Sequence, residues 1–376
     1  MVAIATTWGS PLIGGAVSTT PAGFTRQFKI IVGFLSAAIV LLVFGAPETV
    51  FDRSNYYPPL PVTVTMARLQ SRWPNVKFTK EALWGYLSKM KPYSYKASVV
   101  DIRIIMQAPR AMVAPTTVLL FVTTVLPYAG LWSLASSLSL LFAPMPFMLP
   151  ESTLGVLMTG PFLFITAIGA ALAFASPYLL KRFTTTVHVA TIATATAVAS
   201  IGVFGFGLYI GGTMQTASDV EGGSPWDTGA GSAAARVSLP IVSLLLGLLG
   251  AGSLLLDATA RPVISRSTAF TSSSLPVGLR GTADMHGGLS GLRGLAAGAL
   301  ALALPHSAWG QGATWDGLRS ATLGLGAAQL LVAAAACAAF WFLDQRIRRR
   351  DGRAMGLVDL ASLGSKQRQG SFFDTD

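Results

Sequence analysis

Seven long apolar stretches constrain the fold of this chain more than any other feature of its sequence. A helix needs about 20 mostly apolar residues to cross a membrane. Seven segments reach that length: Phe28–Ala46, Val113–Phe142, Thr153–Leu180, Thr185–Ile210, Val237–Leu256, Gly291–Trp309 and Ser320–Leu343. Pro127, in the second segment, predicts a kink or a tilt there. The sequence therefore predicts an all-α integral membrane protein with about seven transmembrane helices.

The composition agrees with a membrane protein. Of the 376 residues 52% are hydrophobic and only 11% are charged, and the mean hydropathy is +0.58. A soluble domain carries roughly 25% charged residues, so this chain has too few to cover a surface that faces water. The single cysteine, Cys337, has no second cysteine for an internal disulfide, and we expect it to pack as a small apolar residue. Gly294 and Gly298 form a GxxxG pair, which predicts close packing of two helices.

Lysine and arginine fall in every second loop. Of the 27 such residues, 23 lie in four segments: ten in 47–111, two in 181–184, four in 257–293 and seven in 344–376. The loops between these segments hold only Arg236 and Arg319, while Arg26 and Lys29 flank the first stretch on the opposite side. The positive-inside rule then puts the central loop and the tail in the cytoplasm of a plasma-membrane protein. The net charge of +11 thus predicts topology rather than nucleic-acid binding.

The predicted organisation has four parts. They are an N-terminal stub with the first membrane helix, a central cytoplasmic loop, a six-helix bundle and a basic tail, over residues 1–46, 47–111, 112–343 and 344–376. In the loop, Lys80–Met90 has apolar residues at helical spacing among lysines, which is typical of a basic amphipathic helix on membrane lipid. The first 18 residues are apolar but too short to span, and they lack the charged start of a signal peptide.

Ionisable residues are expected only at the ends of the six later spans. Asp257, Arg293 and Asp344 each adjoin an apolar stretch. Because membrane-embedded catalysis and ion paths use ionisable groups inside the bundle, this pattern argues against an enzyme. The three histidines show no ligand spacing, and no ATP-binding loop is present. We therefore expect no catalytic residue, no metal and no cofactor.

Two motifs resemble a transporter family. One resembles the glycine–proline signature that closes the fifth helix of drug:proton antiporters in the major facilitator superfamily, with one inserted residue, and it comprises Gly9, Pro11, Gly14 and Gly15. The segment Phe44–Arg53 resembles the end of the sixth helix in fungal members, where a PET…R sequence leads into a long cytoplasmic loop. Six spans then follow, as in the C-terminal half of that superfamily. Lys181 and Arg182 occupy the place of the short cytoplasmic connection between helices eight and nine of that superfamily. They lack the acidic residue and the glycine of the loop motif that the family carries there.

The resemblance implies a fold and a function. A full member has two pseudo-symmetric halves with the substrate site between them. This chain would comprise the sixth helix and the C-terminal six-helix bundle, as a fragment of a longer protein or as a half-transporter. It would export a small organic molecule, a drug or a metabolite, by ion-coupled alternating access. The pocket would lie between helices seven, eight, ten and eleven of the full fold, with Tyr128, Trp132, Ser136, Phe162 and Ser243 as candidate lining residues. Proton coupling would be expected, although the predicted spans contain no carboxylate to carry the proton.

Two other classes remain open. The chain could be a truncated membrane remnant without transport, or an interaction subunit of a larger complex. A seven-helix receptor would share the topology, but it would have a short first loop in place of about 65 residues, and a proline motif in the last span. A retinal-binding receptor would need a lysine in the last span, and Ser320–Leu343 has none.

Overall fold

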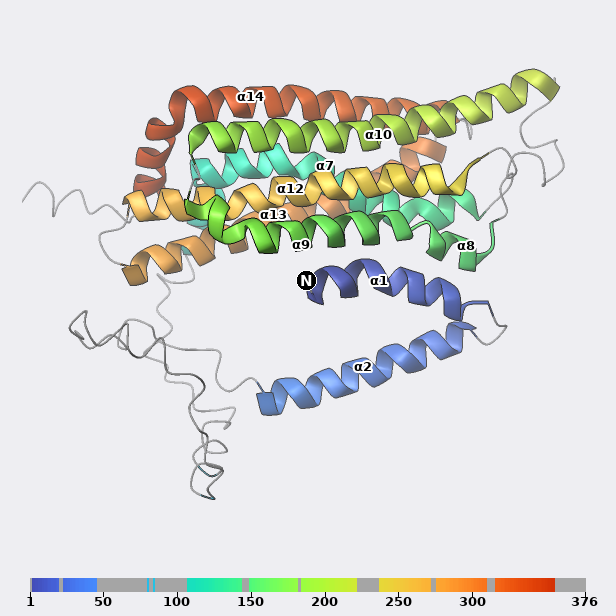
Figure 1. The fold of residues 1–376 in the computed structure, drawn as a ribbon, viewed down its shortest axis with the longest axis horizontal. Helices are drawn as coiled ribbons and strands as arrows, with labels where there is room; N and C mark the ends of the chain where they lie inside the picture. Colours follow the sequence, from blue (N-terminus) through green and yellow to red (C-terminus); the bar gives the residue numbers. More distant parts are fainter. Residues whose placement is uncertain are drawn as a thin grey trace, which may run out of the picture. The chain divides into compact units, whose positions relative to one another are not determined.

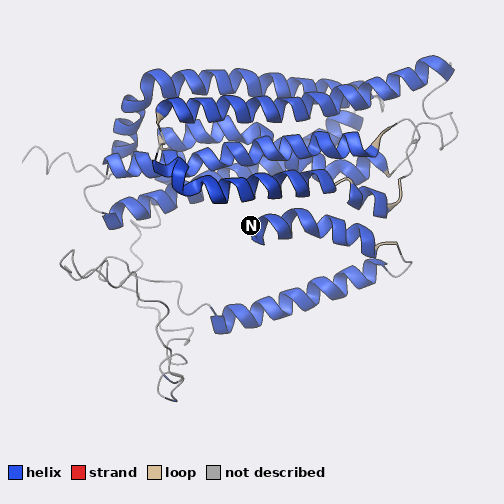
Figure 2. Cartoon of the chain, viewed as in Figure 1, coloured by secondary structure: helices blue, strands red, loops and turns tan. Residues whose placement is uncertain are grey.

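The structure, a computed structural model, is helical, and no strand occurs among the residues it describes (Figure 2). These residues are 2–19, 23–45, 80, 84, 107–143, 149–181, 184–221, 237–271, 275–309 and 315–355. Contacts divide the chain into two units, one of residues 1–23 with 107–376 and the other of residues 24–106. The helix α2 (Gly23–Gly45) belongs to the smaller unit, and its apolar side chains, such as Phe28 and Phe34, are exposed.

The larger unit contains the remaining helices, which Figure 1 labels. They are α1 (Val2–Val17), α6 (Gln107–Val113), α7 (Pro115–Phe142), α8 (Glu151–Val156), α9 (Thr159–Lys181), α10 (Thr185–Glu221), α12 (Leu239–Thr271), α13 (Leu275–Trp309) and α14 (Trp315–Met355). The long helices α10, α12 and α14 run side by side, and α7 packs against α13, α12 and α14. The short α1 packs against α8 and α9, and α9 packs against α12.

Six stretches of helix are long and apolar enough to cross a membrane. They are Pro115–Phe142, Glu151–Ala175, Thr185–Thr213, Leu239–Ala269, Gly281–Pro305 and Gly317–Met355. They correspond to the last six spans that the sequence predicts, and they indicate a multi-pass membrane protein. The first predicted span forms the helix α2 but is not among the six, so the seventh membrane helix stays a prediction.

Glycines set the closest helix contacts. A Cβ atom on Gly252 of α12 would lie 2.5 Å from the backbone nitrogen of Ala199 on α10. Only glycine lets two backbones approach this closely, as is usual between membrane helices. The expected contact at Gly294 and Gly298 is absent from the described part of the chain, because no atom lies within 4 Å of a Cβ built on either residue.

The bundle buries two apolar clusters with a polar layer between them. On α12, Leu249 belongs to one cluster and Leu256 to the other, and the buried Ser253 lies between them. Three other helices contribute buried polar side chains between apolar cluster residues in the same way: Thr123 and Thr124 on α7, Thr196 on α10 and Gln329 on α14. Two hydrogen bonds in this layer join helices, because Arg293 of α13 donates to the Thr124 hydroxyl and Gln329 of α14 donates to α7. The Nε2 atom of Gln329 donates to the Thr123 carbonyl at 3.0 Å.

Four of the later helices extend well beyond a predicted end. The helix α10 continues past Ile210 to Glu221, α12 past Leu256 to Thr271 and α14 past Leu343 to Met355. The helix α13 begins at Leu275 instead of Gly291. The predicted spans of α12 and α14 end directly before Asp257 and Asp344, and that of α13 begins two residues before Arg293. A helix continues through a charged residue if the side chain pairs inside the bundle or lies outside the hydrocarbon layer. The sequence alone does not show which of these situations applies.

Several predicted features lie outside the described residues. These are the PET…R segment after Gly45, the amphipathic helix Lys80–Met90 apart from Lys80 and Trp84, and the tail after Met355.

Candidate functional site

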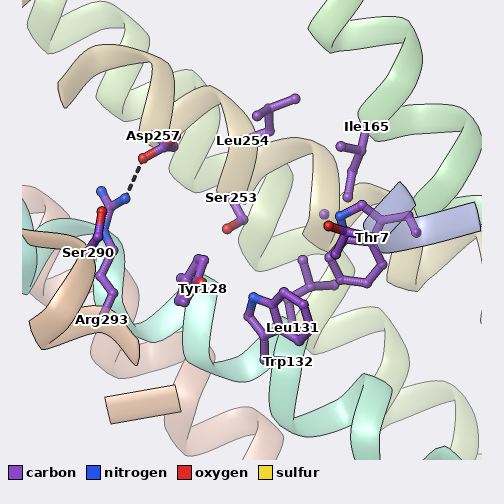
Figure 3. A pocket seen from close by; sticks show the side chains of 12 residues that line it. Thr7, Tyr128, Leu131, Trp132, Ile165, Ser253, Leu254, Asp257, Ser290 and Arg293 are labelled. Atoms are coloured by element: carbon purple, nitrogen blue, oxygen red, sulfur yellow. Dashed lines mark hydrogen bonds and ion pairs between the residues drawn. The ribbon is translucent and has the colours of Figure 1, made fainter. Parts of the chain in front are cut away.

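A cavity of about 370 Å³ opens within the larger unit, among α1, α7, α9, α12 and α13 (Figure 3). Its walls combine aromatic rings, small polar groups and one pair of opposite charges. The lining residues are Thr7, Trp8, Tyr128, Leu131, Trp132, Ile165, Gly250, Ser253, Leu254, Asp257, Ser290 and Arg293. We call this the aromatic cavity. Its volume is within the range of small-molecule sites in proteins, about 300–1,000 Å³.

An ion pair between Asp257 and Arg293 borders the aromatic cavity (Figure 3). Nη1 of Arg293 donates to Oδ1 of Asp257, and Nε donates to the Thr124 hydroxyl at 2.8 Å. The expectation that these two charges stand at the ends of spans is wrong. Arg293 is the middle residue of Gly281–Pro305, and Asp257 lies near the middle of Leu239–Ala269. The two opposite charges neutralise each other where α12 and α13 meet.

The two charged groups differ in burial. The Arg293 side chain is 6% exposed, whereas that of Asp257 is 52% exposed. Nη2 of Arg293 is buried and has no hydrogen-bond partner among the described residues. A buried donor without a partner loses its hydration without a replacement. The guanidinium is therefore fixed in the wall with one donor nitrogen to spare, while the carboxylate of Asp257 remains accessible.

A row of aromatic rings leads away from the ion pair. The guanidinium carbon of Arg293 lies 5.9 Å from the centre of the Tyr128 ring, within the range of a cation–π contact. The centres of the Tyr128 and Trp132 rings are 6.3 Å apart, and those of Trp132 and Trp8 are 5.3 Å apart. Tyr128 and Trp132 are four residues apart on α7 and so share one face of the helix. The aromatic cavity thus has a charged end and an aromatic end.

The structure brings together two of the five pocket residues predicted from the sequence. Tyr128 and Trp132 line the aromatic cavity. Ser136, one turn further along α7, is exposed, and its hydroxyl donates to the carbonyl of Ser133 at 3.0 Å. It is not a lining residue, although it follows the same helical spacing.

The remaining two candidates serve helix packing. The hydroxyl of Ser243 on α12 accepts a hydrogen bond from the backbone nitrogen of Gly160 on α9 at 2.8 Å. Phe162 on α9 faces α1, where a Cβ atom on Gly9 would lie 3.4 Å from its ring. Neither side chain lines the aromatic cavity.

The antiporter-like motif lies where α1 contacts α8 and α9. A Cβ atom on Gly15 would lie 2.7 Å from the Cα of Gly155 on α8, and one on Gly155 would lie 2.9 Å from the carbonyl oxygen of Pro11. The carbonyl of Gly14 accepts a hydrogen bond from the Ser18 hydroxyl at 2.8 Å, at the end of α1. The motif therefore brings α1 close to its neighbours, and the aromatic cavity receives Thr7 and Trp8 from the same helix.

Sequence reasoning missed the charged end of the cavity. The sequence-based prediction places Asp257 and Arg293 at the ends of spans and does not include Ser253 or Ser290 among the pocket residues. One feature of the sequence could have indicated this ion pair: an acid and a base, Asp257 and Arg293, each adjoin one of two consecutive apolar stretches. Opposite charges on neighbouring membrane helices commonly pair.

No group of three or more histidine, cysteine, aspartate or glutamate side chains that could hold a metal occurs in the described ranges. Comparison with protein-family models, with curated proteins and with solved structures found no match to this chain.

Proposed function

We propose that this protein moves a small organic molecule across a membrane by ion-coupled alternating access. The observation that carries the proposal is the aromatic cavity, which lies within the helices and holds a charged pair in mid-span. Ionisable side chains inside membrane helices are costly and usually serve a function. Aromatic rings beside a few convergent polar groups are typical of small-molecule sites.

The resemblance to the major facilitator superfamily supports the same function. It implies a pocket between helices seven, eight, ten and eleven, which correspond to α7, α9, α12 and α13 if this chain is the C-terminal half of such a protein. The aromatic cavity is lined by these four helices together with α1. The membership in this superfamily, the cytoplasmic position of the central loop and the location in the plasma membrane belong to the proposal.

Asp257 is our candidate for the proton carrier. Among the described lining residues it is the one acidic side chain, and it is half exposed. In this proposal, a proton bound by Asp257 neutralises the carboxylate and weakens its attraction to Arg293. Weakening this ion pair would loosen the contact between α12 and α13. Local changes of charge of this kind drive helix movements in other proteins. We propose binding and transport rather than catalysis for the cavity.

Accumulation in proteoliposomes tests the proposal. The purified chain is reconstituted, incubated with a mixture of small organic compounds under an imposed pH gradient, and the vesicle contents are measured by mass spectrometry. At least one compound should accumulate with the wild-type chain, less so with Trp132→Ala, and not after the gradient is collapsed. Protein-free vesicles are the control. No accumulation of any compound would contradict the proposal and favour the remnant, and accumulation only with a co-expressed partner would favour the interaction subunit.

A further inference from the structure

We infer that the aromatic cavity takes a zwitterion with an aromatic ring, the class to which the aromatic amino acids belong. The inference rests on the proposed function and names the class of substrate. It uses three properties of the cavity: its charge balance, the free atoms of its ion pair and the position of its rings.

The charges of the cavity lining cancel. Among the described lining residues, Asp257 supplies one negative charge and Arg293 one positive charge. A bare cation or anion would add an unbalanced charge at the middle of two membrane helices, where the dielectric constant is low. A zwitterion brings both charges at once and leaves the sum at zero.

Each member of the ion pair also has capacity for a second partner. Asp257 bonds Arg293 through Oδ1, and its side chain remains half exposed in the cavity, so an ammonium group has access to the carboxylate. Nη2 of Arg293 is a buried donor without a partner in the described part of the chain. A ligand carboxylate would supply that partner in a charge-assisted hydrogen bond. Because Nη2 is buried, a neighbouring side chain must move as the ligand enters. We expect this to be Tyr128, whose ring centre lies 5.9 Å from the guanidinium carbon on the cavity wall.

The aromatic end determines the rest of the ligand. Figure 3 shows Tyr128 between the ion pair and Trp132, and the two ring centres are 6.3 Å apart. The ring centre of Trp8 lies 5.3 Å from that of Trp132. Aromatic rings pair favourably at centre distances of about 4.5–7 Å. A ligand whose charged groups meet Asp257 and Arg293 would therefore direct its own ring toward the two indoles.

The unequal burial of the pair ranks the ligands that carry one charge. A cation that draws Asp257 away would leave the buried Arg293 without a counter-charge, which is strongly unfavourable. An anion that draws Arg293 away would leave Asp257, which is half exposed and can be hydrated. The zwitterion should bind most tightly, the anion second and the cation most weakly.

Three probes of similar size test this order: L-phenylalanine, 3-phenylpropionate and phenethylamine. The full chain is placed in lipid nanodiscs, and the affinity of each probe is measured by titration calorimetry. L-phenylalanine should bind at least about tenfold more tightly than either of the others. If a singly charged probe binds as tightly as L-phenylalanine, or if none of the three shows saturable binding, the inference is wrong.

Charge variants provide a second measurement. Asp257→Asn should shift the preference to 3-phenylpropionate, and Arg293→Gln should shift it to phenethylamine. Ser136→Ala, outside the cavity on the same helix as Trp132, should leave the order unchanged. A preference that stays the same in both charge variants would contradict a role of the pair. If either variant fails to fold, the relative affinities of the three probes for the wild-type chain still test the inference.

The inference and the proposed function fail in different ways. If L-phenylalanine binds in nanodiscs while proteoliposomes accumulate no compound, the ligand class stands and transport is wrong. If another compound accumulates and excess L-phenylalanine does not compete with it, transport stands and the ligand class is wrong.

Discussion

Asp351, near the end of α14, caps the beginning of α7 through Thr116. The backbone nitrogen of Thr116 donates to Oδ1 of Asp351 at 2.8 Å, and the Thr116 hydroxyl donates to Oδ2. The residue at the start of the helix, Ala114, has no side chain that could satisfy this donor. Ser267 of α12 donates to the same carboxylate at 2.6 Å. One buried acid thus joins α7, α12 and α14.

Replacing Asp351 should destabilise this end of the bundle. Asp351→Ala removes the acceptor of the buried Thr116 amide and hydroxyl and a bond from Ser267, and we expect a loss of about 2–4 kcal/mol in the free energy of unfolding. Asp351→Asn keeps one carbonyl acceptor and should lose less. Thermal unfolding in detergent measures the loss, and hydrogen exchange should increase at the Thr116 amide. Arg349→Ala, an exposed neighbour on α14, is the control; an equal loss in the control would contradict the cap.

The unequal burial of Asp257 and Arg293 predicts an unequal effect of their removal. Asp257→Asn leaves a charged Arg293 that is 6% exposed, and we expect the free energy of unfolding to decrease by about 3 kcal/mol or more. Arg293→Gln leaves Asp257 half hydrated in the cavity and should cost only about 1–2 kcal/mol. Thermal unfolding of both variants and of the double variant measures the order. In the double variant the loss should be smaller than in Asp257→Asn alone, because no charge remains unpaired.

The spans were predictable from the sequence because a membrane helix needs a long apolar run, which is a local property. The ends of α12 and α13 were not. Asp257 and Arg293 are 36 positions apart in the chain, and their pairing exists only after the two helices have packed. Hydropathy along the chain cannot distinguish a charge at the membrane surface from one that is neutralised inside the bundle.

The candidate pocket was predictable only in part for a related reason. Tyr128, Trp132 and Ser136 follow one another at intervals of four on α7, and the helix is apolar on all sides, so the sequence does not reveal where along this face a cavity begins or ends. Ser243 resembles a pocket residue in sequence, yet its hydroxyl bonds Gly160 between two helices. The contribution of α1 was hidden as well, because its 16 residues are too few to span a membrane.

Two glycines on adjacent helices should respond oppositely to alanine. In Gly252→Ala the new methyl group would lie 2.5 Å from the Ala199 nitrogen, and α10 and α12 must separate, at about 1–3 kcal/mol. In Gly298→Ala the methyl group meets no atom within 4 Å, and the better helix propensity of alanine should be neutral or add up to about 1 kcal/mol. Thermal unfolding of both variants in the same detergent measures the contrast. Equal effects would show that the close approach of α10 and α12 does not limit stability.

The alternation of basic loops predicts the side of the membrane on which each loop lies. Single cysteines are placed at Ser98 in the 47–111 loop and at Ser232 in the 211–236 loop, after Cys337→Ala has removed the native thiol. A membrane-impermeant maleimide should label Ser232→Cys in intact cells and Ser98→Cys only after permeabilisation. The opposite labelling would show that the topology is inverted. Labelling of both cysteines in intact cells would place the two loops on the same side of the membrane and contradict the three predicted spans between them.

Trp132 should contribute to ligand binding, whereas Ser136, four residues further along α7, should not. The Trp132 ring stands between those of Tyr128 and Trp8, so Trp132→Ala removes the middle of the aromatic wall. An aromatic pair contributes about 0.5–1.5 kcal/mol beyond the area it buries, which corresponds to a loss of up to about tenfold in affinity for L-phenylalanine. Trp132→Phe should retain most of the wild-type affinity, because an aromatic ring remains at this position. Ser136→Ala should bind as the wild type does, since that hydroxyl bonds its own helix at Ser133. Titration calorimetry in nanodiscs compares the three variants, and equal affinities would remove Trp132 from the site even if the protein transports another compound.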